Sequence, residues 1–219
     1  MATVLLDCGF GSFDSLSTLA PNVQLNALIL SHAHPDHVAD LEAFLAEASR
    51  WRTVPHVIAS RETIDGVPLD VATLGPGSLR CVSDGEHVTA NGFEAEFSST
   101  THQIPTLGVQ ITMGGSRAVY GADTGPKWIW PATFRLPDVA IVECTFEERG
   151  DSSSPFHLDA REVADLVEDL SPSTTLLTHV PPAEDGERRR EIVQRFAPAT
   201  RVVLASVGLT LEVGRERLL

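Results

Sequence analysis

The feature that most constrains the fold of this chain is the hexapeptide His32-Ala33-His34-Pro35-Asp36-His37, which directly follows the apolar run Leu28-Ile29-Leu30. A strand that ends in three imidazoles and a carboxylate can present two histidines toward one point and the Asp-His pair toward a neighbouring point. Nitrogen and oxygen ligands of this kind suit Zn²⁺. The segment therefore predicts a metal site at the end of a buried strand, in preference to a solvated loop that is rich in histidine by chance.

Three later segments each place a further metal-binding side chain where a strand-like run ends. Each side chain follows an apolar or β-branched run, and Gly or Pro residues lie close by. The three residues are His102, Asp123 and His179. Taken singly, each could be an ordinary strand-end residue, and aspartate is common in turns. Their common context makes a shared metal site the better interpretation.

This ordered series, together with Leu5-Leu6-Asp7-Cys8-Gly9, resembles the metallo-β-lactamase superfamily. Within it, the chain resembles the branch of ribonuclease Z and the cyclic-nucleotide phosphodiesterases. The resemblance extends over nearly the whole chain. It implies an α/β fold of one particular kind, an αββα sandwich in which two packed mixed β-sheets carry helices on their outer faces.

The resemblance also implies two divalent metal ions. Each ion would have three ligands of its own and one shared carboxylate: His32, His34 and His102 for one ion, Asp36, His37 and His179 for the other, and Asp123 for both. A water shared by two such ions loses its proton near neutral pH and becomes a nucleophile, and the ions stabilise charge on a phosphoryl or carbonyl oxygen. Zn²⁺ is the favoured metal, and Mn²⁺ and Fe²⁺ accept the same ligands.

Two more motifs separate the branches of the superfamily. The run from Ile141 to Phe146 resembles the glutamate-containing motif of ribonuclease Z relatives, and the run from Pro155 to Asp159 resembles their His-Ser-Thr motif. The resemblance implies that His157 is a general acid and that Glu143 orients it. We count both, with Asp36, as catalytic residues. Without the resemblance, either of the two could be structural, although a charge that ends a buried strand is unusual unless it is paired.

Composition narrows the class of protein. The 219 residues, of which 42% are hydrophobic, favour a single domain over residues 1–219 with an ample core. No apolar run is long enough to predict a membrane span, and the N-terminus resembles a strand more than a signal peptide. Cys8, Cys81 and Cys144 are odd in number and widely spaced, which favours reduced, buried thiols in a cytoplasmic protein.

The formal net charge of −14 disfavours long nucleic acids as partners. The densest basic run, residues 188–190, has flanking glutamates and helical spacing, so we expect a solvated helix face. A groove built from Arg50, Arg52 and Arg61 would favour RNA binding. Two histidines outside every motif, His56 and His87, are interpreted as structural. Core or dimer packing is the better interpretation of Trp128 and Trp130, although both could stack on a base.

Strand-like and helix-like runs alternate along the chain, which is typical of an α/β fold. A later helix opens with a capping box, Asp159 followed by Glu162, and two apolar runs around Gly114-Gly115 predict a β-hairpin. In all, we expect strands at 28–30, 57–59, 88–97, 109–113, 118–120, 139–142, 176–177 and 202–204, and helices at 38–49, 160–170 and 187–196.

The sequence thus predicts a dinuclear-metal phosphodiesterase that acts on a small, anionic, cyclic nucleotide. True ribonuclease Z enzymes insert a long tRNA-binding arm between the equivalents of His102 and Asp123, whereas only 20 residues (103–122) separate them here. The alternatives are an arm-less nuclease that acts on RNA ends, a thioester or lactone hydrolase that does not call for Glu143 and His157, and a metal-bound domain without turnover. The resemblance further implies a homodimer.

Overall fold

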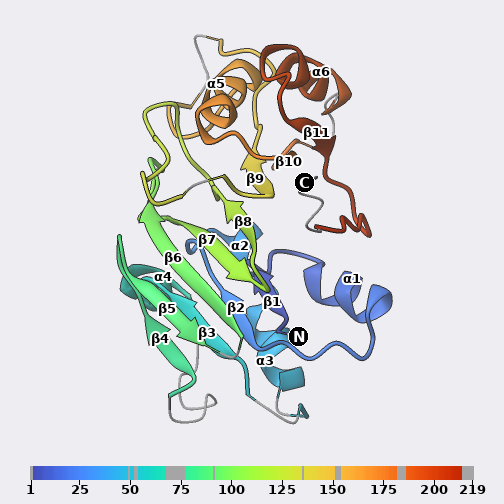
Figure 1. The fold of residues 1–219 in the computed structure, drawn as a ribbon. Coiled ribbons are helices and arrows are strands. Elements are labelled where there is room, and N and C mark those ends of the chain that lie inside the picture. The colour runs from blue at the N-terminus through green and yellow to red at the C-terminus, as the bar shows by residue number, and fades with distance from the viewer. Residues whose placement is uncertain are drawn as a thin grey trace.

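The computed structural model describes residues 2–48, 50–51, 54–67, 77–90, 92–134, 136–150, 154–181 and 186–213. Strands and helices alternate along most of this length (Figure 1). In chain order they are β1 Val4–Leu6, α1 Ser12–Leu19, β2 Ala27–Ile29, α2 Pro35–Val38, α3 Leu41–Ala48, β3 His56–Ala59, α4 Arg61–Gly66, β4 Leu79–Cys81, β5 His87–Ala90, β6 Phe93–Ser99, β7 Leu107–Met113, β8 Ser116–Tyr120, β9 Val139–Glu143, α5 Ala160–Leu170, β10 Thr174–Thr178, α6 Gly186–Phe196 and β11 Arg201–Leu204.

The strands form two sheets. The smaller sheet has the order β1-β2-β3-β4, and all of its described strand pairs are parallel. The larger sheet has the order β11-β10-β9-β8-β7-β6-β5; it is parallel from β8 to β11 and antiparallel from β5 to β8. The expectation of two mixed sheets is therefore correct for the larger sheet and wrong for the smaller one.

Side chains that alternate along the strands form three apolar layers. In β2, Ala27 and Ile29 pack against the other sheet, whereas the next residues along, Leu28 and Leu30, pack under helices that include α3. A strand buried on both faces has a continuous apolar sequence, which is why the run before the hexapeptide does not alternate. Helices α5 and α6 cover β9 to β11, at the opposite end of the molecule from α1 and α3 (Figure 1). The predicted αββα sandwich is confirmed.

The helix predicted at residues 38–49 is divided and begins earlier. Pro35 opens α2, because its fixed φ suits the first helical position. The chain then leaves the helix after Val38, and α3 begins at Leu41. Asp40 lies at the break: its Oδ2 accepts a hydrogen bond from the backbone N–H of Phe13 at 2.9 Å, and its own N–H donates to Cys8 at 2.9 Å. The end of the predicted helix, at Ser49, lies outside the described residues.

Local signals in the second half of the chain are confirmed. Gly114 and Gly115 have φ values of 59° and 87°, as the two central residues of a tight type I′ hairpin turn require, and they join β7 to β8. The capping box of α5 is present: the Asp159 side chain accepts from the N–H of Glu162, and the Glu162 side chain accepts from the N–H of Asp159. Trp128 is buried in the core, and Nε1 of the half-buried Trp130 donates to the carbonyl of Leu166 at 2.9 Å.

Two expectations about burial are wrong. Cys81 is exposed because it ends β4, the edge strand of the smaller sheet, whereas Cys8 and Cys144 are buried; all three are free thiols. In the basic run of α6, Arg189 is only 1% exposed, and its Nη2 donates to the carbonyl of Thr145 at 3.0 Å. Among the described residues, no helix combines the length and the apolar character that crossing a membrane requires.

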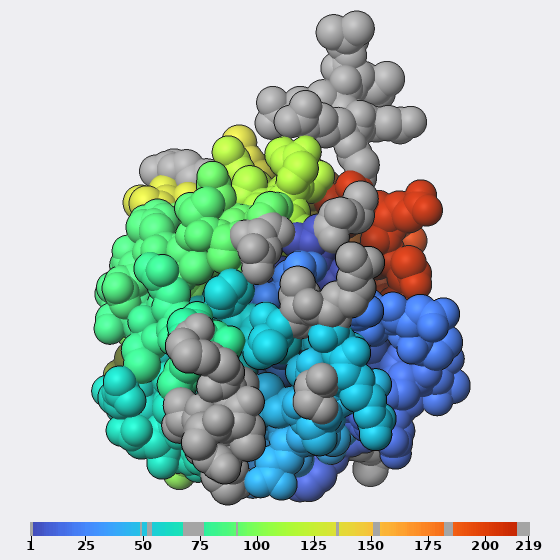
Figure 2. Space-filling model, turned by 90° about the horizontal axis from the view of Figure 1, so that it is seen from below, coloured from blue at the N-terminus to red at the C-terminus, as the bar shows by residue number. Residues whose placement is uncertain are grey.

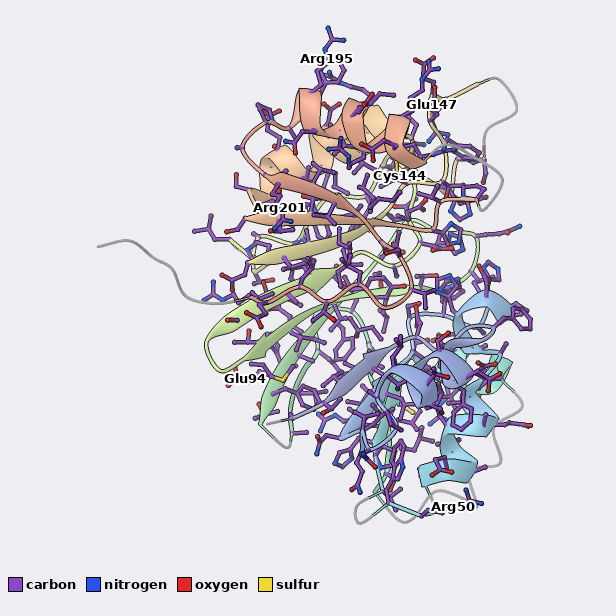
Figure 3. The ribbon with its side chains drawn as sticks, turned by 90° about the vertical axis from the view of Figure 1, so that its right-hand side faces the viewer. Arg50, Glu94, Cys144, Glu147, Arg195 and Arg201 are labelled. Atoms are coloured by element: carbon purple, nitrogen blue, oxygen red, sulfur yellow. The ribbon has the colours of Figure 1, made fainter. Side chains whose placement is uncertain are left out.

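The arginines named for an RNA groove do not form one in the described structure. Arg50 pairs with Glu47 at 2.7 Å, and Arg61 lies 3.9 Å from Asp65, so each has an acidic neighbour on its own segment. Arg52 lies outside the described residues. Figure 3 shows Arg50 and Arg195 at opposite ends of the molecule. The face seen from below in Figure 2 is built from the first strands and helices of the chain, in blue and cyan, beside the green strands of the larger sheet.

Candidate metal centre

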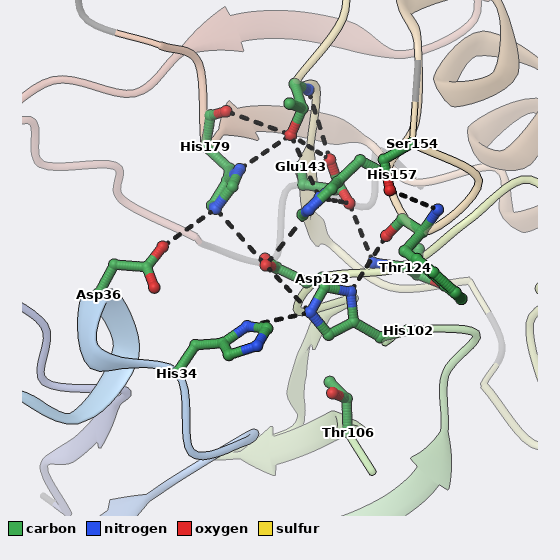
Figure 4. A network of polar contacts seen from close by, with 12 residues as sticks. His34, Asp36, His102, Thr106, Asp123, Thr124, Glu143, Ser154, His157 and His179 are labelled. Carbon is green, nitrogen blue, oxygen red and sulfur yellow. Dashed lines mark hydrogen bonds and ion pairs between the residues drawn. The ribbon is translucent and has the colours of Figure 1, made fainter. Parts of the chain in front are cut away.

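The predicted site residues lie at one edge of the two sheets, where strands end. Neighbouring parallel strands end at the same edge of a sheet, and β6 and β8, separated by the antiparallel β7, also run in the same direction. Strands β1, β2, β6, β8 and β10 are each followed within three residues by a polar side chain of the cluster: Asp7, His32, His102, Asp123 and His179. Figure 4 shows His34, His102, Asp123, His157, His179 and Asp36 directed toward one another.

The first predicted ligand set is brought together tightly. Nδ1 of His34 lies 3.0 Å from Nε2 of His32 and 3.2 Å from Nε2 of His102. Oδ2 of Asp123 lies 3.8 Å from both of these Nε2 atoms. Two nitrogens that each lie ~2.05 Å from one tetrahedral Zn²⁺ are about 3.3 Å apart. The four side chains are therefore spaced as ligands of one ion would be, and they form one of the clusters that could hold a metal.

The second predicted set, Asp36, His37 and His179, forms another such cluster. Oδ2 of Asp36 lies 3.3 Å from Nε2 of His179 and 3.6 Å from Nε2 of His37. Asp123 contacts this set as well, with Oδ1 3.4 Å from Nε2 of His37 and Oδ2 3.5 Å from Nε2 of His179. One carboxylate thus lies between the two sets, as a bridging ligand would.

Nε2 of His37 supplies a direct test of whether a metal ion fits. This atom is buried and has no hydrogen-bond partner in the described structure. A buried polar atom without a partner is costly, and a coordinate bond to a metal ion would satisfy it. The donor set of imidazole nitrogens and carboxylate oxygens suits Zn²⁺. The residues present therefore fit a pair of divalent ions.

For four of the five ligand histidines, a hydrogen bond on the far side of the imidazole fixes which nitrogen faces the cluster. Nδ1 of His32 lies 2.9 Å from Oγ of Ser31, and Nδ1 of His102 lies 3.1 Å from the carbonyl of Phe156. In the second set, Nδ1 of His37 lies 2.7 Å from Asp7, and Nδ1 of His179 lies 2.8 Å from Oγ1 of Thr145. Such outer partners orient metal-binding histidines and raise their basicity.

Asp7 and Thr145 are the residues whose roles the sequence reasoning missed. Oδ2 of Asp7 accepts from Oγ of Ser31, from His37 and from the hydroxyl of Tyr120, each at 2.7 Å, and Oδ1 accepts from the N–H of Ser31 at 2.7 Å. The backbone of Asp7 has a φ of 56°, in the left-handed region. The available signal was a charged residue directly after an apolar strand; for Thr145 the sequence offers only its place in a motif.

The electrostatic setting of the cluster suits a cation. Burial and the neighbouring charge of His37 lower the pKa of His32 to about 2, so this imidazole is neutral and keeps a lone pair. Burial alone would raise the pKa of Asp123, but contacts with His37 and His179 hold it below its usual range. Burial alone would lower the pKa of His37, but Asp123 and Asp7 raise it to about 10. Carboxylates here favour positive charge, which a metal ion would supply.

Glu143 and His157 meet beside the second ligand set. Nδ1 of His157 lies 2.9 Å from Oε1 of Glu143, and its ring stacks on that of His179 with centroids 5.2 Å apart. Glu143 is only 1% exposed, and it also accepts from the N–H of Thr124 at 3.0 Å and from Oγ1 of Thr145 at 2.6 Å. Burial alone would lower the pKa of His157, but the hydrogen bond and charge of Glu143 raise it.

All nine residues predicted for the site are therefore close together, although their roles stay predictions. His56 and His87 are not among them: His56 begins β3, and His87 lies in β5 with Nε2 3.9 Å from Glu96.

The cluster is open to solvent on the side of Asp36, His179 and His157, whose side chains are 56%, 28% and 20% exposed, whereas the side chain of Asp123 is 3% exposed.

The chain is similar in sequence to known proteins. The chain is 26% identical over 188 aligned residues to the probable metallo-hydrolase YhfI of Bacillus subtilis (strain 168), covering 82% of this chain and 75% of the relative. It is 27% identical over 220 aligned residues to ribonuclease Z of Mycobacterium sp. (strain KMS), covering 84% and 76%.

Solved structures show the same fold. The crystal structure of YhfI matches with a TM-score of 0.77 at 24% identity, covering 94% of this chain and 85% of that one. A diphosphatase of the PhnP family matches with a TM-score of 0.73 at 19% identity, covering 95% and 79%. The family described as "Beta-lactamase superfamily domain" matches residues 2–180. The chain therefore belongs to this family, and it is a hydrolase of the metallo-β-lactamase fold, as its resemblance to that superfamily predicted.

Proposed function

We propose that the chain is a two-metal phosphodiesterase that hydrolyses a small nucleotide phosphodiester, with cyclic nucleotides as the first substrates to test. The observation that carries this proposal is the hydrogen bond of 2.9 Å between Glu143 and His157, beside the second ligand set. Cleavage of a phosphodiester releases a sugar alkoxide, a strong base that needs a proton. A thiolate needs one far less, because a thiol has a pKa of about 8.5. The pair therefore favours a phosphodiester over a thioester.

The chain's own residues would divide the work as follows. His32, His34 and His102 would hold one ion, Asp36, His37 and His179 the other, and Asp123 both, with Zn²⁺ as the favoured metal. When bound, two such ions supply an activated water and neutralise charge on a phosphoryl group. Glu143 would keep Nδ1 of His157 occupied. Nε2 of His157 has no hydrogen-bond partner among the described residues and would deliver a proton to the leaving oxygen.

A small substrate is favoured over a long nucleic acid for three reasons. The net charge of −14 repels polyanions. Strands β7 and β8 are joined by a two-residue turn, so the segment between His102 and Asp123 carries no arm. Arg50 and Arg61 have acidic neighbours on their own segments. An RNA nuclease is the second candidate, because relatives that are 27% identical are named ribonuclease Z.

Hydrolysis of a substrate panel by the purified, metal-loaded protein tests the proposal. The panel contains 3′,5′-cyclic purine and pyrimidine nucleotides, bis-p-nitrophenyl phosphate, a short RNA and an acyl thioester. We expect turnover of a cyclic nucleotide that falls ~10²–10⁴-fold in His157→Ala, the usual contribution of a general acid. The matched control is His87→Ala, at a site where 67% of the side chain is exposed. Cleavage of RNA alone would favour the second candidate, and thioester cleavage alone would refute both.

Two organisational expectations belong to the same proposal. We propose that residues 1–219 form one domain and that the protein is a homodimer, as its resemblance to the superfamily implies. A single cooperative unfolding transition would support the first statement. Light scattering that gives twice the chain mass of 23.6 kDa would support the second, and a mass equal to one chain would refute it.

A further inference from the structure

Two backbone carbonyls of the loop that carries His157 accept hydrogen bonds from the side chain of one arginine. Nη2 of Arg149 donates to the carbonyl of His157 at 2.7 Å, and Nη1 donates to the carbonyl of Ser154 at 2.9 Å. On its other side, Arg149 reaches the two carboxylate oxygens of Glu162, with Nε 2.9 Å from Oε1 and Nη2 2.6 Å from Oε2. A bidentate pair of this kind fixes the plane of the guanidinium group, so its remaining donors point in fixed directions.

Glu162 gives this bridge a firm base. It lies in the first turn of α5, and its Oε2 also accepts from the N–H of Asp159 at 2.9 Å as part of the capping box. Asp159 accepts in turn from the backbone N–H of Arg149 at 3.1 Å. The helix itself is anchored, because its apolar face is buried against the larger sheet. The bridge therefore connects a fixed helix end to the His157 loop.

The arrangement is more than a surface ion pair. The side chains of Arg149 and Glu162 are 28% and 23% exposed, and partly exposed ion pairs contribute little to stability by themselves. The Arg149 guanidinium also lies 6.0 Å from the centroid of the Phe146 ring, which is 6.4 Å from the His157 ring. Arg149 thus contacts the loop of His157 and, through Phe146, one side of its ring.

We propose that Arg149, anchored by Glu162, is a positioning residue that holds His157 against Glu143 and thereby sets how efficiently the leaving group is protonated. This inference rests on the proposed role of His157. The physical reason is distance: a general acid acts only within hydrogen-bond reach of the oxygen that it protonates, and a shift of about 1 Å is enough to lose that reach.

The test uses leaving groups of different basicity with Arg149→Gln, Arg149→Lys and the control Arg161→Gln. Like Glu162, Arg161 lies in the first turn of α5. It pairs with Asp165 at 3.3 Å, and its side chain is 53% exposed. We expect Arg149→Gln to lower kcat about 10- to 100-fold on diesters with alkoxide leaving groups, a part of the general-acid contribution. Rates on p-nitrophenyl diesters, KM and metal content should change less than about twofold. Arg149→Lys should restore part of the loss, and Arg161→Gln should match the wild type.

A second readout does not depend on activity. In protein with isotope-labelled histidine rings, the ring resonances of His157 are assigned by their loss in His157→Ala. They should shift in Arg149→Gln and not in Arg161→Gln. If Arg149→Gln does not fold, Glu162→Gln releases the same bridge from its other end, and glutamine still suits the capping box. It should give the same dependence on leaving group.

The outcomes separate this inference from the function on which it rests. Equal losses on both kinds of leaving group, or unshifted His157 resonances, would overturn the role of Arg149 while leaving the phosphodiesterase proposal intact. Loss of activity in Arg149→Gln that adds fully to that of His157→Ala would also overturn it, because residues that act through one another are not additive. A wild type that cleaves no phosphodiester would refute the proposed function, even if the resonances shift.

Discussion

Asp7→Asn is the substitution that most directly tests how the second ligand set is built. A carboxylate can accept all four hydrogen bonds that reach Asp7, three at Oδ2 and one at Oδ1, each 2.7 Å long. Asparagine has the same shape but only one accepting oxygen. If that oxygen takes the place of Oδ2, the amide NH₂ faces the N–H of Ser31, and two donors oppose each other.

Two separate magnitudes follow from this geometry. One buried donor without a partner costs about 1–3 kcal/mol, so the free energy of unfolding of the metal-free protein should fall by that amount. The loss of the negative charge behind His37 weakens this residue as a ligand. Removing such an outer partner lowers metal affinity about 10- to 100-fold, or roughly 1.4–2.8 kcal/mol. The effect should be larger for the ion held by Asp36, His37 and His179, because Asp7 contacts His37 directly and reaches His32 of the other set only through Oγ of Ser31.

The assay is a competition titration with a chromophoric chelator, which yields one dissociation constant for each ion. Chemical denaturation of the metal-free protein gives the stability change. Asp14→Asn, at an exposed position of α1, is the matched control and should change neither quantity. If Asp7→Asn left both dissociation constants unchanged, or weakened both ions equally, the assignment of Asp7 to one ligand set would be refuted.

Asp123→Ala should prevent stable binding of both ions and abolish hydrolysis, because this carboxylate lies within 3.8 Å of nitrogens from both ligand sets. Metal analysis of the dialysed protein measures the loss of the ions. Retention of one ion at full affinity would contradict a bridging role. Gly125→Ala should displace the His157 loop, because the new Cβ would lie 2.1 Å from the carbonyl oxygen of Pro155. Overpacking of this kind costs about 1–3 kcal/mol. The midpoint temperature of thermal unfolding and the rate of hydrolysis of a diester with a poor leaving group should both fall. The control Gly150→Ala, whose Cβ would meet nothing within 4 Å, should behave as wild type.

The part of the site that could be predicted from the sequence is the part written in short runs. The hexapeptide places three histidines within six consecutive residues, and His102, Asp123 and His179 each lie within three residues of a strand end. The carboxyl ends of strands that run in the same direction meet at one edge of a sheet, so residue type and position relative to the strand end were enough to predict these ligands. The capping box and the Gly114-Gly115 turn were also readable, because their hydrogen bonds connect residues only a few positions apart.

The outer partners could not be predicted, because their hydrogen bonds join distant segments. Asp7 reaches Tyr120 across 113 positions, and Thr145 reaches His179 across 34. The local sequence places Asp7 directly after an apolar strand and Thr145 within a motif, but it does not show which residue either of them contacts. The break before α3 has the same origin, since Asp40 accepts its hydrogen bond from Phe13, 27 positions away. The sequence pattern predicts a helix that continues through Asp40. The helix is interrupted at Asp40, where the side chain contacts Phe13.

Arg189 shows most clearly why local patterning fails next to the site. Its neighbours Arg188 and Arg190 pair with Glu147 and Glu187 at the surface, as a solvated helix face requires. Arg189 points inward instead and donates to the carbonyl of Thr145, whose hydroxyl lies 2.6 Å from Glu143 and 2.8 Å from His179. A buried guanidinium is costly unless it is hydrogen-bonded, and the hydrogen bond to Thr145 offsets part of this cost. Arg189, whose burial the sequence misjudged, is thus a residue that positions the predicted site through Thr145.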